Sequence, residues 1–365
     1  MIPFRAIDRD ALVLLTQRSD GSDFAKRRLI AKIGKDFRLG RLQFGPNEDP
    51  DHAWKMCEAR LMLGDWSNWN GWQFRSKWAA SWAANRVKDG VARWRGQRVK
   101  RLYVYGEQGI GDEIFFGQAL TWLKTQVDSV IVETDERLML PFSRSLGIET
   151  VATEFGTDAA GKKERRMHAV DGDAWTLLGD LVVRSGPQPA PYLVAKDAEV
   201  KRFAGYRGAT GISWRGNQGY YGAQDFGPGV SLQYDQGWDE EVEKPRDASG
   251  TDLDLRGDIE GLLGLLSNLR KVVTVSTSVA HFACALGVET HVVLAPLNGL
   301  NRNVLPWKWW SEKTPGKTPW YDSVHVYRDL RDYRARTLGA AQGLGGKNRR
   351  SHGCEDERPV MAERR

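Results

Sequence analysis

One stretch of the sequence joins a strand-like run to a glycine-rich turn: Leu102-Tyr103-Val104-Tyr105-Gly106-Glu107-Gln108-Gly109-Ile110-Gly111-Asp112. The apolar residues that follow, at positions 114–123, have helical spacing. A strand that passes through glycines into a helix presents backbone N–H groups at the positive end of the helix dipole. The stretch therefore predicts the first strand–turn–helix unit of a parallel α/β sheet, with phosphate or a carboxylate at the helix N-terminus.

The glycine spacing differs from the Gly-x-Gly-x-x-Gly fingerprint of dinucleotide-binding proteins. The glycines alone are equally compatible with a tight packing turn. Asp112 shifts the interpretation towards chemistry, because a carboxylate at the carboxyl end of a parallel strand is well placed to act as a general base.

The alternation of short apolar strands and helices continues along the chain in two units. Such an alternation predicts doubly wound parallel sheets. The expected strands are 102–105, 130–132, 149–151, 210–214, 230–233, 272–275 and 290–294, and the expected helices are 114–123, 138–146, 259–269 and 279–286. Residues 156–166 and 218–229 read as loops, and residues 235–254 as a charged surface excursion.

The two ends of the chain have a different character. The first hundred residues read as helices, with a helix start at Asp49-Pro50-Asp51 and tryptophans at helical spacing from Trp69 to Trp82. The residues after Leu330 are rich in glycine and charge, which predicts a disordered basic tail. We therefore divide the sequence into a helical, repeat-like region (1–97), two Rossmann-like units (98–205 and 206–330) and a tail (331–365).

A second stretch that can carry chemistry follows the strand at 272–275: Ser276-Thr277-Ser278-Val279-Ala280-His281. Three hydroxyl residues at a helix start can hold a diphosphate together with the free backbone N–H groups, and His281 lies one turn further on. The alternative is ordinary helix capping with a hydrogen-bonded core histidine.

Several motifs, taken in order, resemble those of bacterial tetratricopeptide-repeat glycosyltransferase-like proteins, which are relatives of the ADP-heptose:lipopolysaccharide heptosyltransferases. Residues 106–116 resemble their W-G-E-Q-G-L-G-D-x-I-x-F loop, and residues 272–296 their V-I-T-V-D-T-x-x-A-H-L-A-x-A-L-G-x-P-x-x-x-L-x-P segment. Residues 210–217 and 230–233 match their G-x-x-W-x-G-N and S-L-Q strands, and residues 319–328 their W-Y-P-S-x-x-x-x-R ending.

The resemblance implies a GT-B fold, with an acceptor-binding first unit, a nucleotide-sugar-binding second unit and a tetratricopeptide-like N-terminal region. It implies an inverting glycosyltransferase that needs no metal or other cofactor and moves a sugar from a nucleotide-diphosphate donor to a saccharide or glycolipid hydroxyl. The catalytic base would be Asp112. The donor diphosphate would be bound by Arg215, Asn217, Ser276, Thr277, Ser278 and His281, and the acceptor-side loop would comprise Gly106, Glu107, Gln108, Gly109 and Gly111.

Two alternatives remain open. Ser276 stands where the family usually has Asp, and the interval between Asn217 and Val230 is short, which favours a degenerate module that binds a sugar nucleotide or a partner without turnover. Cations and tryptophans alternate in residues 71–101, where nine Lys and Arg stand against one Asp. Residues 75–101 could bind nucleic acid, so a transferase acting on modified DNA bases, of the kind a phage could encode, is the other alternative. An amphipathic helix with a solvated basic face is the plainer interpretation.

Composition sets the remaining bounds. With 365 residues, 41% hydrophobic and 27% charged, the chain has the make-up of a globular protein of two or three domains. The N-terminus does not resemble a signal peptide, and no apolar run is long enough to span a membrane, so we expect a cytoplasmic protein. Three cysteines set far apart argue against a disulfide framework and a clustered zinc site.

Overall fold

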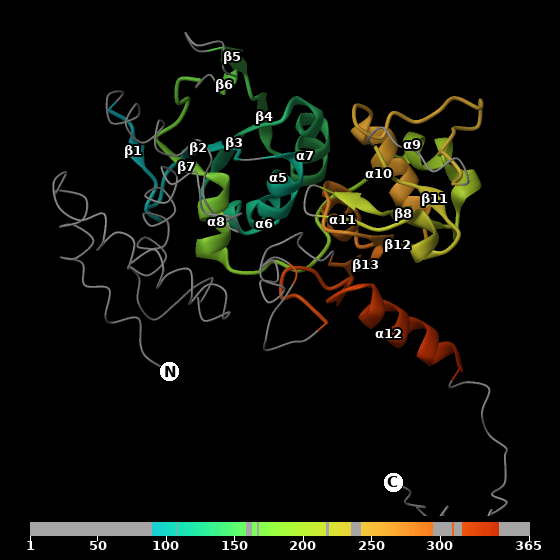
Figure 1. Ribbon diagram of the computed structural model, residues 1–365. Helices are drawn as coiled ribbons and strands as arrows, with labels where there is room; N and C mark the ends of the chain where they lie inside the picture. The colour runs from blue at the N-terminus through green and yellow to red at the C-terminus, as the bar shows by residue number, and fades with distance from the viewer. Residues whose placement is uncertain are drawn as a thin grey trace, which may run out of the picture.

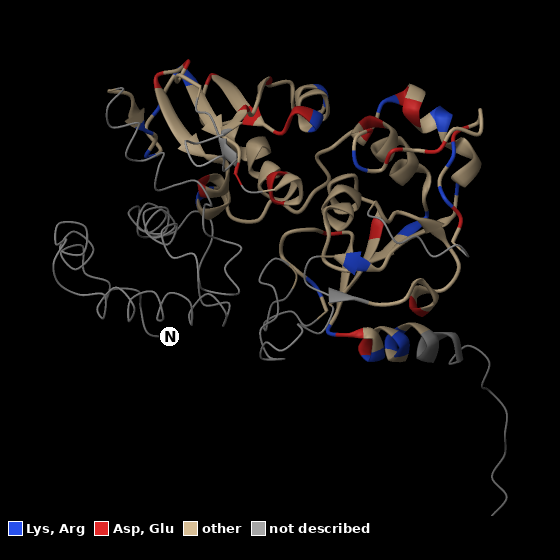
Figure 2. Cartoon of the chain, turned by 45° about the horizontal axis from the view of Figure 1, so that its top comes forward, with Lys and Arg blue, Asp and Glu red and all other residues tan. Residues whose placement is uncertain are grey.

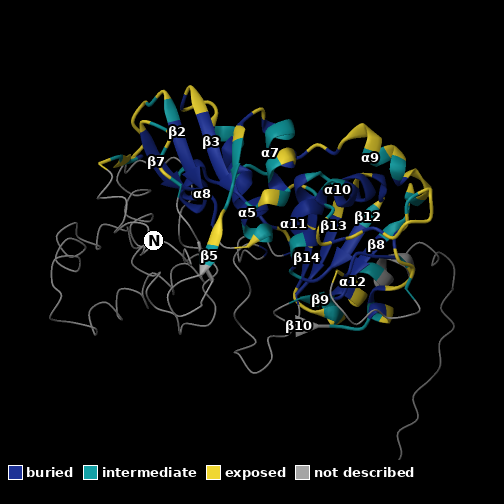
Figure 3. Ribbon diagram, turned by 90° about the horizontal axis from the view of Figure 1, so that it is seen from above, coloured by how far each residue is buried: buried dark blue, intermediate teal, exposed yellow. Residues whose placement is uncertain are grey.

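The computed structural model describes residues 90–107, 109–157, 163–165, 168–216, 219–234, 242–294, 309 and 316–342. Within these ranges the chain is an α/β protein with two five-stranded parallel sheets, which lie side by side with helices α5 and α11 between them (Figure 1). Figure 3 shows that buried residues fill the strands and the helix faces packed on them, while exposed residues gather in the connections.

The first sheet has the strand order β1-β7-β2-β3-β4. Its strands are β1 (Ala92–Arg93), β2 (Arg101–Tyr105), β3 (Ser129–Thr134), β4 (Glu149–Ala152) and β7 (Ala174–Leu177). Side chains alternate across a strand, so Leu102 and Val104 face the helices, whereas Tyr103 and Tyr105 pack with Trp175 on the other face. The helices are α5 (Ile110–Gly117), α6 (Ala119–Leu123), α7 (Met139–Leu146) and α8 (Leu178–Ser185).

The second sheet has the strand order β11-β8-β12-β13-β14. Its strands are β8 (Thr210–Ser213), β11 (Val230–Ser231), β12 (Lys271–Thr274), β13 (Glu289–Val293) and β14 (Val324–Tyr327). Helices α10 (Ile259–Asn268) and α11 (Ser278–Ala285) contribute to one buried cluster with Val272 and Val292, and α9 (Asp197–Arg202) packs against α10. The opposite face carries a second cluster, which includes Val273, Val293, Tyr327 and Tyr333.

Apolar side chains of both halves form one continuous buried cluster. The segment between α8 and α9 helps to join them, because Tyr192 donates its backbone N–H to Ala285 O of α11 at 2.9 Å and its hydroxyl to Ile114 O of α5. Burial raises the pKa of the Tyr192 hydroxyl well above its usual value, so this donor stays protonated. The ion pair between Arg144 of α7 and Glu260 of α10 adds a polar link at 2.5 Å.

The expected strands and helices of both units are present with small shifts in their bounds, except that the expected helix 114–123 is divided into α5 and α6 and begins at Ile110. Gly147 and Gly287 follow the expected helices 138–146 and 279–286 and have φ of 63° and 79°, values that favour glycine. Two details differ from the expected loops. In the first expected loop, β5 (Phe155–Thr157) and β6 (Lys163–Arg165) form an antiparallel pair. In the second, β10 (Gly219–Tyr220) pairs with β9 (Arg215–Gly216), and the short helix η4 (Ala223–Phe226) follows.

The interpretation of residues 331–365 as a disordered tail is wrong for its first part. Leu330–Gln342 forms helix α12, and Tyr333 from this helix is buried against Tyr327 of β14 with ring centroids 5.1 Å apart. The aromatic ring anchors a segment whose composition is otherwise polar. Residues 343–365 lie outside the described residues. Most of the predicted helical region, residues 1–97, also lies outside them; within its described part, Ala92–Arg93 forms β1 of the first sheet.

Candidate functional site

The glycine-rich turn follows β2 and leads into α5. Gly106 donates its N–H to Glu133 O at the end of β3, at 2.6 Å, and a methyl group added at Gly106 would lie 2.5 Å from that same oxygen. Glycine is therefore required sterically at this position. Strand β2 lies between β7 and β3. From β2 the chain continues to β3 and β4 on one side and later adds β7 on the other side, so the strand order reverses at β2. Open parallel sheets bind ligands at such a point, beyond the carboxyl ends of the strands.

Asp112 is half-buried in the first turn of α5. Its Oδ2 accepts the backbone N–H of Gly109 at 3.4 Å, which orients the carboxylate toward the start of the helix. A negative charge at this position is stabilised by the helix dipole. The predicted base therefore also has a structural role as a capping residue.

The two glutamates beside Asp112 face the interior. Glu107 is fully buried and accepts the N–H of Gly179 at 2.6 Å, which caps the start of α8. Glu113 accepts from Thr134 Oγ1 at 2.5 Å and from Asp135 N at 2.9 Å, which holds the end of β3. Glu107 is part of the predicted acceptor-side loop, and its carboxylate joins the turn after β2 to the start of α8.

The serine- and threonine-rich turn follows β12 and leads into α11. Thr277 is the N-cap residue and is buried, with its hydroxyl 3.3 Å from that of Thr274. Ser276 Oγ accepts the indole N–H of Trp309 at 2.8 Å. Ser278, half-buried, is the first residue of the helix. The N-cap makes no side-chain hydrogen bond to the helix N–H groups, in contrast to the usual use of a hydroxyl there.

His281 is buried one turn into α11. Its Nδ1 lies 3.1 Å from the Tyr321 hydroxyl, its ring stacks on Trp309 with centroids 4.5 Å apart, and Phe115 of α5 meets it edge-on at 5.5 Å. These contacts fix the imidazole plane and place the ring between elements of both halves.

The two turns are in direct contact. A methyl group added at Gly111 would lie 3.1 Å from Ser278 Cα and 3.5 Å from His281 Cδ2. The N-terminal ends of α5 and α11 therefore meet, one carrying a carboxylate and the other hydroxyls. The negative charge of Asp112 also contributes to the raised pKa of Tyr321, although burial is the main cause.

The remaining predicted donor residues come from the turn after β8. Arg215 is half-buried, and its backbone N–H is accepted by Gln233 Oε1 at 3.0 Å. The adjacent Gly216 packs on the second turn, since a methyl group added there would lie 3.0 Å from Thr277 Cγ2. Gln108 and Asn217 lie outside the described residues.

Three contributors were not identified as site residues from the sequence. Tyr321 lies in the segment 319–328 and Gln233 ends the segment 230–233, and both segments match motifs of the family. These matches could have identified both residues from the sequence. Trp309 carried no such signal: it is one of three tryptophans in Trp307-Lys308-Trp309-Trp310, and only the folded chain brings its indole to Ser276 and His281.

The basic, tryptophan-rich stretch is described only from residue 90 onward. There, Arg93 pairs with the buried Asp180, Arg98 with Asp128 at 3.7 Å, and Arg101 with Glu149 and Asp171 at 3.0 and 2.9 Å. Charges of both signs are scattered over the described chain (Figure 2). These ion pairs do not favour a DNA-binding surface in this part of the stretch.

Comparison with protein-family models and with curated proteins found no match. Among solved structures, the chain is similar to a family 9 glycosyl transferase from Veillonella parvula, with 10% identity over 62% of this chain and 86% of that one, and a TM-score of 0.40.

Two further similar structures come from E. coli. ADP-heptose lipopolysaccharide heptosyltransferase II has 13% identity, 67% and 98% coverage and a TM-score of 0.41. Heptosyltransferase WaaC with ADP-2-deoxy-2-fluoro heptose has 11% identity, 67% and 100% coverage and a TM-score of 0.34. Scores this low carry no conclusion about fold or activity.

Of the helices in the described ranges, none has the length and apolar character that crossing a membrane requires.

Proposed function

We propose that this chain is a glycosyltransferase of GT-B type that moves a sugar from a nucleotide-diphosphate donor to a saccharide or glycolipid hydroxyl with inversion. The observation that carries the proposal is the contact between Gly111 and Ser278, because it joins the turn bearing Asp112 to the turn bearing Thr277 and Ser278. The ordered sequence motifs, which match those of heptosyltransferase relatives, support the same conclusion.

Each group has a role in this reaction. Asp112 removes the proton from the acceptor hydroxyl as its oxygen attacks the anomeric carbon, and the bond from that carbon to the diphosphate breaks on the opposite face. The positive end of α11, with Thr277 and Ser278, stabilises the departing diphosphate. Arg215, from the adjacent turn, supplies a positive charge for the same group. The proposed step uses side chains and backbone N–H groups, so we assign no cofactor to it.

Asp112→Asn tests the catalytic assignment. The variant keeps the side-chain size and an oxygen that can accept from Gly109, and it removes the base. We expect transfer, measured with a panel of nucleotide-diphosphate sugars and saccharide acceptors, to fall by about 10²- to 10⁴-fold. Donor binding, measured by thermal shift, is expected to stay within about twofold of wild type, on the order of a few tenths of a kcal/mol.

Asp225→Asn is the matched control. Asp225 Oδ2 accepts the N–H of Gly222 at 3.0 Å at the start of η4, in the same arrangement as Asp112 and Gly109. It also pairs with Arg334 at 2.7 Å, and η4 carries none of the proposed site residues, so this variant shows the cost of losing a capping carboxylate that has no assigned role in the reaction. A loss of activity in Asp112→Asn alone supports catalysis. No response of the wild type to any donor, with Asp112→Asn unchanged in every assay, contradicts it.

A second candidate, a sugar-nucleotide-binding module without turnover, is favoured by one contact. Ser276 stands at the position where the related motif has Asp, and its hydroxyl is engaged by the indole of Trp309. Donor binding by the wild type, without transfer or donor hydrolysis under any condition, would select this candidate. Trp309→Phe then provides a test of the donor side, because it removes the indole N–H and leaves a ring to stack on His281.

A further inference from the structure

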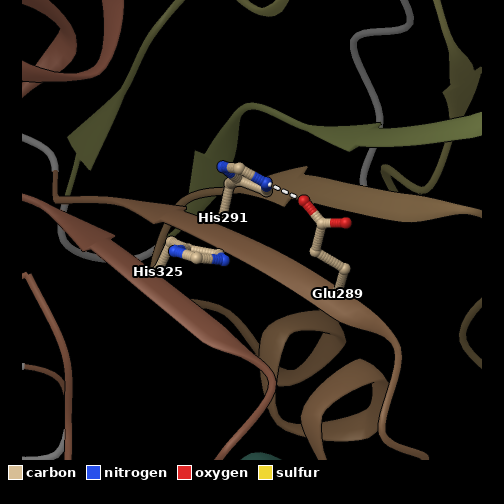
Figure 4. Close-up of side chains that lie close together, drawn as sticks. All are labelled: Glu289, His291 and His325. Atoms are coloured by element: carbon tan, nitrogen blue, oxygen red, sulfur yellow. Dashed lines mark hydrogen bonds and ion pairs between the residues drawn. The ribbon is translucent and has the colours of Figure 1, made fainter. Parts of the chain in front are cut away.

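Three potential metal ligands lie together on one face of the second sheet. Glu289 and His291 are two residues apart on β13 and so project from the same face. His325 of β14 is directly paired with His291 in the parallel register. One ligand atom from each side chain lies within 4.8 Å of the others, and Figure 4 shows the carboxylate directed toward the two imidazoles.

The ring of His291 is held in a defined orientation. Its Nε2 lies 2.7 Å from Glu289 Oε1, and its Nδ1 lies 2.9 Å from the Tyr327 hydroxyl. The ring stacks on His325 at 4.9 Å and lies nearly parallel to Tyr327, at 7°. A metal-bound histidine commonly makes a hydrogen bond through its second ring nitrogen, which fixes the tautomer. Tyr327 is suitably placed to be that partner when Nε2 is the ligand.

We propose that Glu289, His291 and His325 bind a zinc ion. Two imidazoles and one carboxylate are a characteristic zinc ligand set, with water in the fourth position. Water has access, because Glu289 and His325 are both exposed.

Metal binding requires the His325 ring to turn, because an imidazole binds metal through the lone pair in its ring plane and the two rings are stacked. Ligand atoms of a tetrahedral zinc ion lie about 3.3 Å apart for bond lengths near 2.0 Å. The Glu289–His291 hydrogen bond must therefore lengthen, and the exposed His325 side chain must leave its stack on His291. Both side chains that move are exposed, whereas His291 is buried.

The surrounding charges have opposite effects on the site. Burial lowers the pKa of His291, the hydrogen bond that Glu289 accepts opposes this effect, and the neighbouring His325 and Lys271 lower the pKa further. Lys271, opposite Glu289 in the register, competes for the carboxylate and weakens the site.

The location separates this site from the proposed transfer site. Glu289 begins β13 and His325 lies near the start of β14, whereas the turn bearing Ser276–Ser278 follows the opposite, carboxyl end of β12. Zinc would join the last two strands of the sheet, β13 and the terminal β14, and stabilise the fold without entering the reaction. The sequence interpretation assigned no metal ligand, and this inference departs from it.

The test uses the full chain, freed of metal by chelation and carrying His52→Gln, Cys57→Ser, His352→Gln and Cys354→Ser to remove the thiols and imidazoles that lie outside the described residues. Zn²⁺ is titrated by calorimetry, and the thermal unfolding midpoint is followed. We expect one Zn²⁺ per chain and a higher midpoint. Mg²⁺, which prefers oxygen ligands, should produce neither effect. Co²⁺ should give the visible absorption of a tetrahedral site.

Glu289→Gln and His325→Gln should each weaken Zn²⁺ binding by at least about 10-fold. His168→Gln is the control, because His168 belongs to no group of three potential metal ligands among the described residues and lies in the first half of the structure, with its Nε2 3.1 Å from Ala152 O. Glu289 and His325 both have solvent access, so the two variants should fold. Far-ultraviolet circular dichroism checks that they do. Zn²⁺ affinity unchanged in both variants, or no Zn²⁺ binding by the parent, overturns the proposal.

Discussion

Gly111 shows how a single missing side chain can position a site. The gap between α5 and α11 leaves no room for even a methyl group at its normal distance, since that group would lie 3.1 Å from Ser278 Cα and 3.2 Å from Ser278 Cβ. The glycine thus brings the carboxylate turn and the hydroxyl turn together. The sequence interpretation treated the glycine as part of the acceptor-side loop, whereas its contact is with the turn predicted to bind the donor.

Gly111→Val is expected to destabilise the protein by about 1–3 kcal/mol, because the added atoms overpack the contact between two helices. Denaturant unfolding measures this change, and donor binding should weaken in parallel. Gly205→Val is the matched control: a methyl group added there meets no atom within 4 Å, so its cost should stay below about 1 kcal/mol. Equal stability of the two variants would contradict the role given to the Gly111–Ser278 contact.

Residue-scale prediction from sequence was uneven for a physical reason. Asp112 could be assigned a place because the adjacent strand and helix determine it locally. Glu107 could not, because its partner Gly179 is distant in sequence and meets it only through the pairing of β2 with β7. Cys284, one of the three widely spaced cysteines, is a free, buried thiol, and burial raises its pKa to about 12.

At the scale of elements, Asp247 organises the turn before α10. It accepts from Ser249 N at 2.9 Å, Ser249 Oγ at 2.6 Å, Thr251 N at 3.0 Å and Arg202 Nε at 3.1 Å. These bonds, led by that of the Ser249 hydroxyl, lower the pKa of Asp247 from 3.8 to about 2.

Because the folded pKa is lower than the unfolded one, Asp247 stabilises the fold fully above pH 3.8 and loses this effect as the pH falls toward about 2. Asp247→Asn should therefore be less stable than the wild type at pH 5, and the difference should shrink as the pH falls through that window. Urea unfolding at a series of pH values measures it. A difference that stays constant from pH 5 to 2 would show that the charge has no role.

The main elements of both sheets could be predicted because each carries its own pattern: apolar strands, helical spacing and glycines at the helix ends. Strands β1, β7 and β14 were missed, since each has four residues or fewer and owes its place to pairing with neighbouring strands. Helix α12 was missed because its composition is polar and its order depends on Tyr333 packing against β14. The His291–His325 pair likewise exists only through strand register.

At the scale of the whole molecule, the described structure is more closely joined than two independent units would be. One buried cluster includes Val104 of β2 and Val132 of β3 together with Leu263 and Phe282 of the second half. Tyr192 bonds to helices of both halves, as described above. A shared core of this kind favours a single cooperative unfolding transition, whereas domains with separate cores can unfold independently.

Leu263→Ala tests this cooperativity. Leu263 is fully buried on α10, so its truncation should destabilise the second half by about 2–5 kcal/mol. If the core is shared, the free energy of the opening that permits amide hydrogen exchange should fall by the same amount in β2 and β3 of the first half as in β12 and β13. Leu140→Ala, at a side chain that is 62% exposed, should leave both sheets unchanged. Faster exchange confined to the second sheet would show instead that the halves unfold separately, and the contact between α5 and α11 would then be a hinge surface that opens without unfolding either sheet.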